Sequence, residues 1–248
     1  MKPTPSNVLW LLFLAAGLSG CPSTTGLKQT ADAGAAQTSS GTFACESVFR
    51  EEKFVDAAAE MGVSRPDAIT LYSISGAKTS DVVTGFAPAG DRTPTVERAL
   101  ESVAAESQLK AFYVEVDIQN LGGLNSELGH SKADEVFREM TAITERHIRD
   151  LGSDSCSFRH GGDEFSFVVI GPNAAKTDIE AALERADTEI REYIDQQGLS
   201  RIPHPKHPGD ESKYGAGIVF GVSQIDRQES AKDVYGAADR IVEARKSE

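Results

Sequence analysis

Two short runs of alternating apolar and polar residues meet at a pair of glycines within Ser155–Ile170. A period of two is typical of β-strands, and Gly161-Gly162 between the runs predicts a tight hairpin turn. Because glycine adopts positive φ at no steric cost, we expect the chain to reverse sharply there. The turn would carry Asp163 and Glu164 at its tip, ahead of a buried strand. Two acids at a turn can serve solubility alone, so the rest of the chain must decide their role.

The chain of 248 residues has a formal net charge of −13, and its Lys and Arg residues are scattered along the sequence. Contact with a nucleic-acid backbone depends on concentrated positive charge, so we expect no nucleic-acid partner. A nucleotide held through metal ions remains compatible with this charge. The hydrophobic content of 40% is enough for a good core, and the length allows one or two domains.

The amino-terminal residues have the layout of a secretory signal, with an apolar run over Val8–Leu18. This run is shorter than the roughly 20 residues that cross a bilayer. The sequence Leu-Ser-Gly ahead of Cys21 resembles the lipobox of bacterial lipoproteins, in which the cysteine is acylated after cleavage. We therefore expect residues 1–20 to be a signal peptide and Cys21 to be the lipidation site. Two acyl chains would anchor the protein to a membrane, facing the periplasm, and Pro22 in place of Asp favours the outer membrane.

Residues 21–44 are small and polar, with too little apolar surface to fold, and we expect a flexible tether. Residues 45–80 are too short for a ligand-binding fold of their own and are interpreted as a lead-in to a domain at 81–248. Cys45 and Cys156 could pair in an oxidising periplasm. The strand pattern around Cys156 favours a lone buried thiol instead.

The domain alternates strand and helix patterns. Apolar strand patterns cover residues 111–116, 155–170 and 217–222, and amphipathic helical patterns start near residues 91, 131 and 179 and end the chain. This order implies a central, mostly antiparallel sheet with helices packed on it. We therefore predict an α+β fold of the ferredoxin-like or palm type.

Asp117 directly follows the apolar strand pattern, and an acid at the end of a core strand is not a packing residue. If that strand neighbours the hairpin, as consecutive strands usually do, Asp117, Asp163 and Glu164 converge. Mg²⁺ characteristically binds one or two carboxylates together with substrate phosphates, which would relieve the repulsion among these acids. The pattern therefore predicts a metal-dependent site for a phosphate compound. Between the acids, Gly122-Gly123 leaves room for backbone N–H groups to approach a phosphate.

The sequence Arg-His-Gly-Gly-Asp-Glu-Phe at Arg159–Phe165 resembles the signature of GGDEF domains, the diguanylate cyclases that condense two GTP into cyclic di-GMP. The resemblance covers residues 80–248, and five ordered motifs rarely coincide by chance. The other matching motifs are Asp81–Phe86 with Asp91-Arg92, the block Asp117-Ile118, Asn125, Gly129-His130 and Ala133-Asp134, the pair Gly221-Val222, and Ala238-Asp239 with Ala244-Arg245.

The resemblance implies a set of site residues and partners. The substrate would be GTP, and the partner a second copy of the domain, because each domain holds one GTP of the two that react. Mg²⁺ or Mn²⁺ would be the cofactor. The implied metal ligands are Asp117, the carbonyl of Ile118 and Asp163, with Glu164 close by, and Asp163 and Glu164 are the implied catalytic residues, Asp163 taking the proton from the ribose 3′-hydroxyl. Asn125 and Asp134 match positions that read guanine, His130 matches a substrate-lining position, and Arg245 stands for the lysine of the last helix.

The sequence departs from the family pattern on the phosphate side. The family usually has Phe-Lys where this chain has Leu121-Gly122, and the second Asp of the metal block is Gln119. Loss of a lysine that neutralises phosphate charge predicts slower turnover. The inhibitory Arg-x-x-Asp motif is absent, since Gly152 and Ser155 occupy its positions, so product feedback is not expected.

Two functions remain open. The first is a lipid-anchored diguanylate cyclase, although GTP is a cytosolic metabolite and the signal directs the domain across the membrane. The alternative is a catalytically silent GGDEF fold that serves as a binding or interaction module in the envelope. His204 and His207 are interpreted as part of a proline-stiffened surface loop, because no acid or Cys stands at ligand spacing with them.

Overall fold

The computed structural model describes residues 43, 54–74 and 80–247. The chain forms two compact units, Met1–Thr79 and Ser80–Glu248, and each is described by itself. The expected signal peptide, the lipidation site Cys21, the tether and Cys45 lie outside the described residues. Within the described part, no helix is long and apolar enough to cross a membrane.

The described part of the first unit consists of two short helices. One covers residues 54–60 and is followed by Gly62, whose φ of 80° suits glycine. The other, α3 (Arg65–Ile74), follows Ser64, whose hydroxyl accepts a hydrogen bond from the Asp67 N–H. Val55, Ala58 and Ala68 form a small buried cluster between them.

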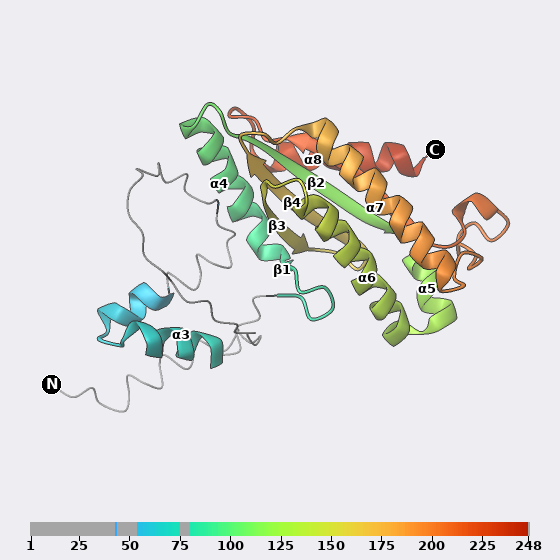
Figure 1. The fold of residues 1–248 in the computed structure, drawn as a ribbon, viewed down its shortest axis with the longest axis horizontal. Helices are drawn as coiled ribbons and strands as arrows, with labels where there is room; N and C mark the ends of the chain where they lie inside the picture. Colours follow the sequence, from blue (N-terminus) through green and yellow to red (C-terminus); the bar gives the residue numbers. More distant parts are fainter. Residues whose placement is uncertain (1–42, 44–53, 75–79, 248) are drawn as a thin grey trace, which may run out of the picture. The chain divides into compact units, whose positions relative to one another are not determined.

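The second unit alternates helices and strands along the chain (Figure 1). The helix α5 was not predicted, and α6 begins at His130, close to the start near residue 131 that the helical pattern predicted. The elements are β1 (Ala87–Pro88), α4 (Arg92–Ala105), β2 (Lys110–Gln119), α5 (Leu121–Leu128), α6 (His130–Arg149), β3 (Asp154–Arg159), β4 (Glu164–Gly171), α7 (Lys176–Gln196), β5 (Gly217–Gln224) and α8 (Ala231–Lys246).

The sheet has the strand order β1-β3-β4-β2-β5. Only the short pairing of β1 with β3 is parallel among these neighbours, and the other three pairings are antiparallel. The strand β2 is an interior strand and is buried from Ala111 to Ile118, with β4 and β5 on its two sides. The predicted α+β fold with a mostly antiparallel sheet is confirmed.

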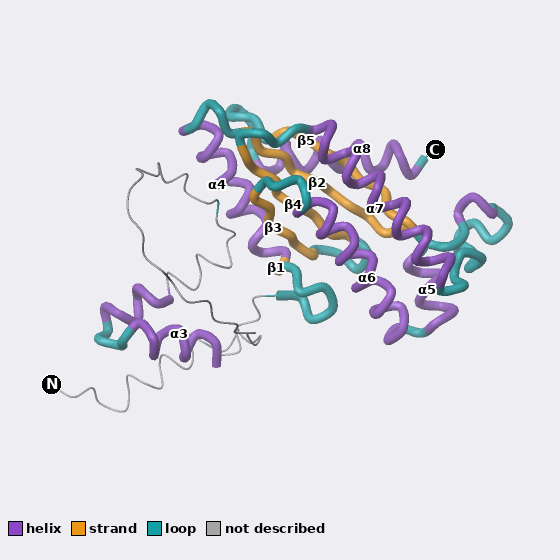
Figure 2. Tube along the Cα trace, in the orientation of Figure 1, coloured by secondary structure: helices purple, strands orange, loops and turns teal. Residues whose placement is uncertain are grey.

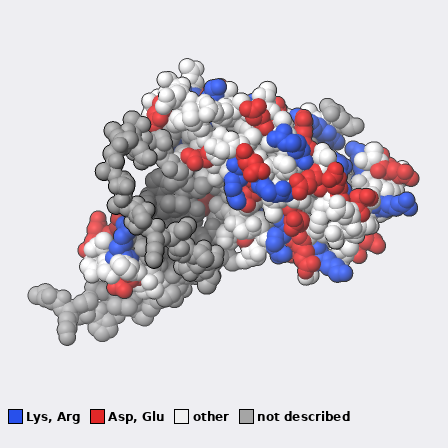
Figure 3. Space-filling model, in the orientation of Figure 1, with Lys and Arg blue, Asp and Glu red and all other residues white. Residues whose placement is uncertain are grey.

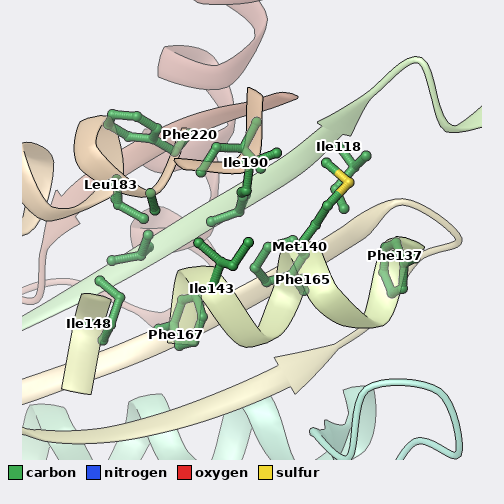
Figure 4. Close-up of a cluster of buried hydrophobic side chains, with 14 of the residues drawn as sticks. Ile118, Phe137, Met140, Ile143, Ile148, Phe165, Phe167, Leu183, Ile190 and Phe220 are labelled. Carbon is green, nitrogen blue, oxygen red and sulfur yellow. The ribbon is translucent and has the colours of Figure 1, made fainter. Parts of the chain in front are cut away.

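The main core lies between one face of the sheet and the helices α6 and α7, which run side by side over it in Figures 1 and 2. Apolar side chains from alternate positions of β2 and β4 point into this layer, and full burial of each contributes about 1.5–3 kcal/mol. Figure 4 labels part of this core, which includes Ile118, Phe137, Met140, Ile143, Ile148, Phe165, Phe167, Leu183, Ile190 and Phe220.

The other face of the sheet carries α4 and α8. Tyr113 of β2 contacts both helices, through Arg92 of α4 and through the ring of Tyr235 of α8. The helix α8 approaches β5 closely, since a Cβ on Gly221 would lie 2.2 Å from the Ala238 carbonyl oxygen. This close packing brings the carboxyl end of α8 to the end of β2 at which Asp117 lies.

Cys156 of β3 is buried and disulfide-bonded. Our expectation of a lone thiol at this position is therefore wrong. Cys45, the partner considered from the sequence, lies outside the described residues.

Candidate functional site

The turn between β3 and β4 is closed by backbone hydrogen bonds. The N–H groups of His160 and Gly161 donate to the Glu164 carbonyl oxygen at 3.3 and 3.2 Å. Neither Gly161 nor Gly162 has a positive φ, so the expectation of left-handed glycines in this turn is wrong. Gly161 is needed for space instead, because a Cβ there would lie 2.8 Å from the Cβ of Glu164. Asp163 remains in the tip, and Glu164 is the first residue of β4.

The side chain of Arg159 holds this turn in place. Its guanidinium donates to the carbonyl oxygens of Gly161 and Gly162 at 3.3 and 2.9 Å, and it pairs with Asp81 at 2.9 Å. Burial raises the pKa of Asp81, but hydrogen bonds from Thr84 and Arg159 outweigh the burial and hold that pKa below its usual value. The motif Asp81–Phe86 thus helps to hold the turn between β3 and β4, here called the signature turn.

The sheet brings three carboxylates to one of its ends. Asp117 faces Glu164 across the β2–β4 ladder, and the Ile118 N–H donates to the Asp163 carbonyl oxygen at 2.9 Å. Asp117 is only 8% exposed, whereas Asp163 is open to solvent. Burial raises the pKa of Asp117 above its usual value and the charges of Asp163 and Glu164 add to the rise, although a hydrogen bond from Lys246 opposes it.

Lys246, which ends α8, is a site residue that the sequence analysis missed. Its Nζ lies 2.8 Å from Asp117 Oδ2. Arg245, which we expected to line the substrate site, points elsewhere and donates to the Phe220 carbonyl oxygen at 3.0 Å. One residue along a helix turns the side chain by about 100°. The buried row Ala238 and Val242 continues at the next i+4 position to Lys246, and this spacing could have identified it.

A cavity of about 400 Å³ opens beside Asp117 and Asp163. Its described lining includes four cationic residues against these two carboxylates, in a chain whose net charge is −13. On the face shown in Figure 3, basic and acidic side chains are interspersed. The lining of the cavity, by comparison, has more cationic residues than carboxylates. The cationic residues are Arg191, Lys206, Lys213 and Lys246, and His204, His207, Gly122 and Ile118 also line the cavity.

The residues expected to read guanine form a second cluster on α5 and α6. Asn125 Oδ1 lies 3.0 Å from His130 Nδ1, and both side chains are at the surface. Asp134 stands four residues after His130 on α6, so the two side chains share a helix face. None of these three residues lines the cavity. These three residues, here called the base-side cluster, therefore lie outside the cavity that adjoins the carboxylates.

A buried polar network supports the turn on the α4 and α8 side of the sheet. His160 Nε2 lies 3.0 Å from Glu115 Oε1, and the Tyr113 hydroxyl donates to Glu115 Oε2 at 2.5 Å. Burial, together with the charge of Glu115, raises the pKa of Tyr113 well above its usual value. Arg92 supplies the positive charge, with Nη1 3.9 Å from Glu115. The sequence analysis missed this network because an acid inside a strand pattern has no local signature.

The oxygen donors at the end of β2 fit a hard divalent cation. No group of three or more His, Cys, Asp and Glu side chains arranged to hold a metal occurs in the described part of the chain. The available donors are the carboxylates of Asp117 and Asp163 and the Ile118 carbonyl. Mg²⁺ needs few protein ligands because substrate phosphates and water supply the others. The Asp117 carboxylate is paired with the Lys246 ammonium, which balances its negative charge.

The model of the protein family described as "Diguanylate cyclase, GGDEF domain" matches residues 79–248 of this chain. The chain belongs to the GGDEF family. Its compact unit from Ser80 to Glu248 contains the carboxylates, the cavity and the base-side cluster described above. The expectation drawn from the Arg159–Phe165 signature is confirmed at the level of the family.

Solved structures of GGDEF domains share the fold. The coiled coil and GGDEF domain of DgcB from Caulobacter crescentus, in complex with c-di-GMP, is 20% identical over 80% of this chain and 94% of that chain, with a TM-score of 0.56. The diguanylate cyclase SiaD from Pseudomonas aeruginosa, in complex with its activator SiaC, is 19% identical over 82% of this chain and 70% of that chain, with a TM-score of 0.53. The FimX GGDEF domain from Pseudomonas aeruginosa is 17% identical over 67% and 93%, with a TM-score of 0.51. No curated protein matches the chain.

Proposed function

We propose that this GGDEF protein is a diguanylate cyclase that condenses two GTP into cyclic di-GMP. A ribose 3′-hydroxyl attacks an α-phosphate and pyrophosphate leaves. The observation that carries the proposal is the pair Asp117 and Asp163, held at one end of the sheet beside a cavity lined by four cationic residues. Carboxylates for metal ions next to positive charge for phosphates suit this type of phosphoryl transfer.

Asp117, Asp163 and the Ile118 carbonyl would hold Mg²⁺ or Mn²⁺, with Glu164 close by. When bound, the metal neutralises phosphate charge and lowers the pKa of the attacking hydroxyl. Asp163 is exposed at the tip of the turn, so its carboxylate can accept the proton of the 3′-hydroxyl. Lys246 places positive charge at the same end of β2, where negative charge develops on the leaving pyrophosphate.

The base-side cluster would select guanine. The Asp134 carboxylate can accept hydrogen bonds from the ring N–H and the exocyclic amine of guanine, whereas adenine has no ring N–H at that edge. The Asn125 amide can donate to the guanine carbonyl oxygen. The contact between Asn125 and His130 fixes the orientation of the amide on the short helix α5.

The reaction needs two copies of the domain. Each domain has one such carboxylate end, so each would present one GTP, and the two nucleotides must face each other for both bonds to form. The partner is therefore a second copy of this chain. A shared membrane would raise the local concentration of the domains without creating the facing geometry.

The proposed location is the periplasmic side of a membrane, through lipidation at Cys21, with the outer membrane favoured by Pro22. The disulfide at Cys156 supports an oxidising compartment, because disulfides persist there and are rare in the cytosol. Protease access after the outer membrane alone is opened tests this location directly. Digestion of the domain only after the inner membrane is opened would contradict it.

Activity is tested with residues 22–248, GTP and Mg²⁺, with cyclic di-GMP measured by chromatography. We expect product from the unmodified chain, a loss of at least about 1,000-fold in Asp163→Asn, and full activity in Asp150→Asn, a control at another exposed aspartate. If neither the unmodified chain nor Gly122→Lys forms product, the alternative function applies and the protein is a catalytically silent binding module. The glycine at position 122, where the family usually has lysine, favours this alternative.

A further inference from the structure

The segment between α7 and β5, residues 203–215, is here called the His-Pro loop. Its base is tied to the end of β2 by Asn120, whose Nδ2 donates to the carbonyl oxygens of Ile202 and Gly215 at 3.1 and 2.8 Å. Asn120 is 5% exposed and has a φ of 59°, a left-handed conformation that Asn tolerates better than most residues. The buried, fixed anchor places the loop beside the carboxylate end of the sheet.

The His-Pro loop lies against the first turn of α5. A Cβ on Gly123 would lie 2.7 Å from the Pro203 carbonyl oxygen, and a Cβ on Gly122 would contact Pro205 at 3.5 Å. Gly122 is the position at which the family usually has lysine. The loop therefore occupies space next to the point where that lysine would start, and the glycine pair allows its close approach.

The loop brings two cations into the cavity. Lys206 and Lys213 line it together with Asp117 and Asp163. Arg191 and Lys246, the other cations of the lining, are paired with Asp187 and Asp117. Within residues 54–74 and 80–247, neither Lys206 nor Lys213 has a carboxylate at ion-pair distance. Asp210 of the same loop interacts with the charge of Lys213 but lies beyond ion-pair distance, so two cations without an ion pair remain in one cavity and favour an anionic ligand there.

The loop is also internally ordered. The His207 N–H donates to the His204 carbonyl oxygen at 3.0 Å, and the two imidazole rings lie 5.0 Å apart. The Tyr214 hydroxyl donates to the Pro208 carbonyl oxygen. An ordered loop loses less conformational entropy when it binds a ligand, so binding through the two lysines requires little further ordering of the loop.

We propose that Lys206 and Lys213 bind the terminal phosphates of the substrate triphosphate and take over the charge role of the lysine absent at position 122. The inference rests on the proposed function for the identity of the nucleotide, but it concerns phosphate binding alone. It applies equally to any ligand with linked phosphates, so inorganic tripolyphosphate is a probe that needs no base recognition.

Calorimetric titration of the full chain in detergent, with Mg²⁺ and with GTP, GMP or tripolyphosphate, tests the proposal. In the double variant Lys206→Gln, Lys213→Gln we expect GTP and tripolyphosphate to bind at least about 10-fold more weakly, as for the loss of two charge-assisted hydrogen bonds. GMP binding should stay within about twofold, because GMP has no terminal phosphates to lose. The matched control is Lys110→Gln, Lys232→Gln, which removes the same charge from two exposed lysines at the opposite ends of β2 and α8.

Equal weakening for GTP and GMP, equal weakening in the control, or unchanged tripolyphosphate binding would each overturn the proposal. Circular dichroism of every variant checks that the domain is folded. The outcome is separate from that of the cyclase assay. Lysine-dependent tripolyphosphate binding without cyclic di-GMP would refute the proposed function alone, and product formation without any effect of the lysines would refute this inference alone.

Discussion

The carboxylate end of β2 and the base-side cluster on α5 and α6 are built in different ways. Asp117 is buried in the interior strand β2, is paired with Lys246, and lies next to a turn that is held by backbone hydrogen bonds and by Arg159. Asn125 and His130 lie on exposed helix surface, with one contact between their side chains. The sheet therefore fixes one region before any ligand arrives, and the other is held by two helices alone.

This difference assigns different tasks to the two regions. A fixed carboxylate pair can stabilise charge that develops only in the transition state, because its geometry needs no reorganisation. A surface cluster that contacts the base contributes to binding of substrate and transition state alike, which changes KM more than kcat. Substitutions at matched residue types in the two regions can separate these effects.

The largest effect is expected for Asp117→Asn. The substitution keeps the shape of the side chain and removes the charge that would hold the metal, so the rate of cyclic di-GMP formation should fall at least about 1,000-fold. Lys246 keeps a second carboxylate partner in Glu243, so the fold should persist. Initial rates and thermal unfolding measure the two parts. A rate within about tenfold of the unmodified chain would show that the metal lies elsewhere.

Asp134→Asn is the same chemical change in the base-side cluster. We expect KM for GTP to rise about 10- to 100-fold, the size of one lost hydrogen bond to a charged group, with a smaller change in kcat. Discrimination between GTP and ATP should fall in parallel. Glu135→Gln, an adjacent and exposed acid on α6, is the control for charge. A fall in kcat without a rise in KM would mean that the two regions do not divide the work in this way.

The part of the site that lies on the sheet could be predicted from the sequence, because alternating strand patterns show where each strand ends and which face each side chain takes. Asp117 follows an uninterrupted apolar run, and Asp163 follows a glycine pair in a hairpin, so the pairing of two neighbouring strands is enough to bring them together. The family signature then gave the chemistry. The order β1-β3-β4-β2-β5 was not predicted, because strand patterns do not show which strands become neighbours.

The parts that were missed depend on contacts between elements that are distant in sequence. Lys246 and Arg245 differ by one helical position, and only the packing of α8 on β5 decides which of them faces Asp117. The His-Pro loop reaches the site through Asn120, a contact over more than 80 residues of sequence. No local pattern reports such a contact, so the prolines indicated a stiff loop without showing where it lies.

Gly122 and Gly123 allow a paired test at the boundary of the two regions. Gly123→Ala should destabilise the domain by about 1–3 kcal/mol, because the new Cβ meets Asn120 and the Pro203 carbonyl and displaces the His-Pro loop. Gly122→Ala should stabilise it by up to about 1 kcal/mol, since Ala favours the helix and its Cβ makes only ordinary contact. Urea unfolding measures both. Changes of the same sign would show that the loop does not rest on Gly123.

The smallest effect is expected at Asp81, which belongs to the sheet-borne region through its pair with Arg159. Because hydrogen bonds from Thr84 and Arg159 lower its folded pKa despite burial, its contribution to stability is complete above the unfolded pKa of about 3.9. The contribution is then lost as the pH falls through the lower folded pKa.

Asp81→Asn should therefore reduce the free energy of unfolding by about 1 kcal/mol at neutral pH, and by progressively less below about pH 4. Urea unfolding of both proteins from pH 7 downward measures the difference, and Asp150→Asn controls for the loss of one negative charge. A difference between wild type and Asp81→Asn that stays constant through acid pH would mean that the Asp81 carboxylate charge does not hold Arg159. The signature turn would then depend on its backbone hydrogen bonds alone. The rigidity of the carboxylate end of β2 would come from the sheet, with no contribution from the motif at Asp81.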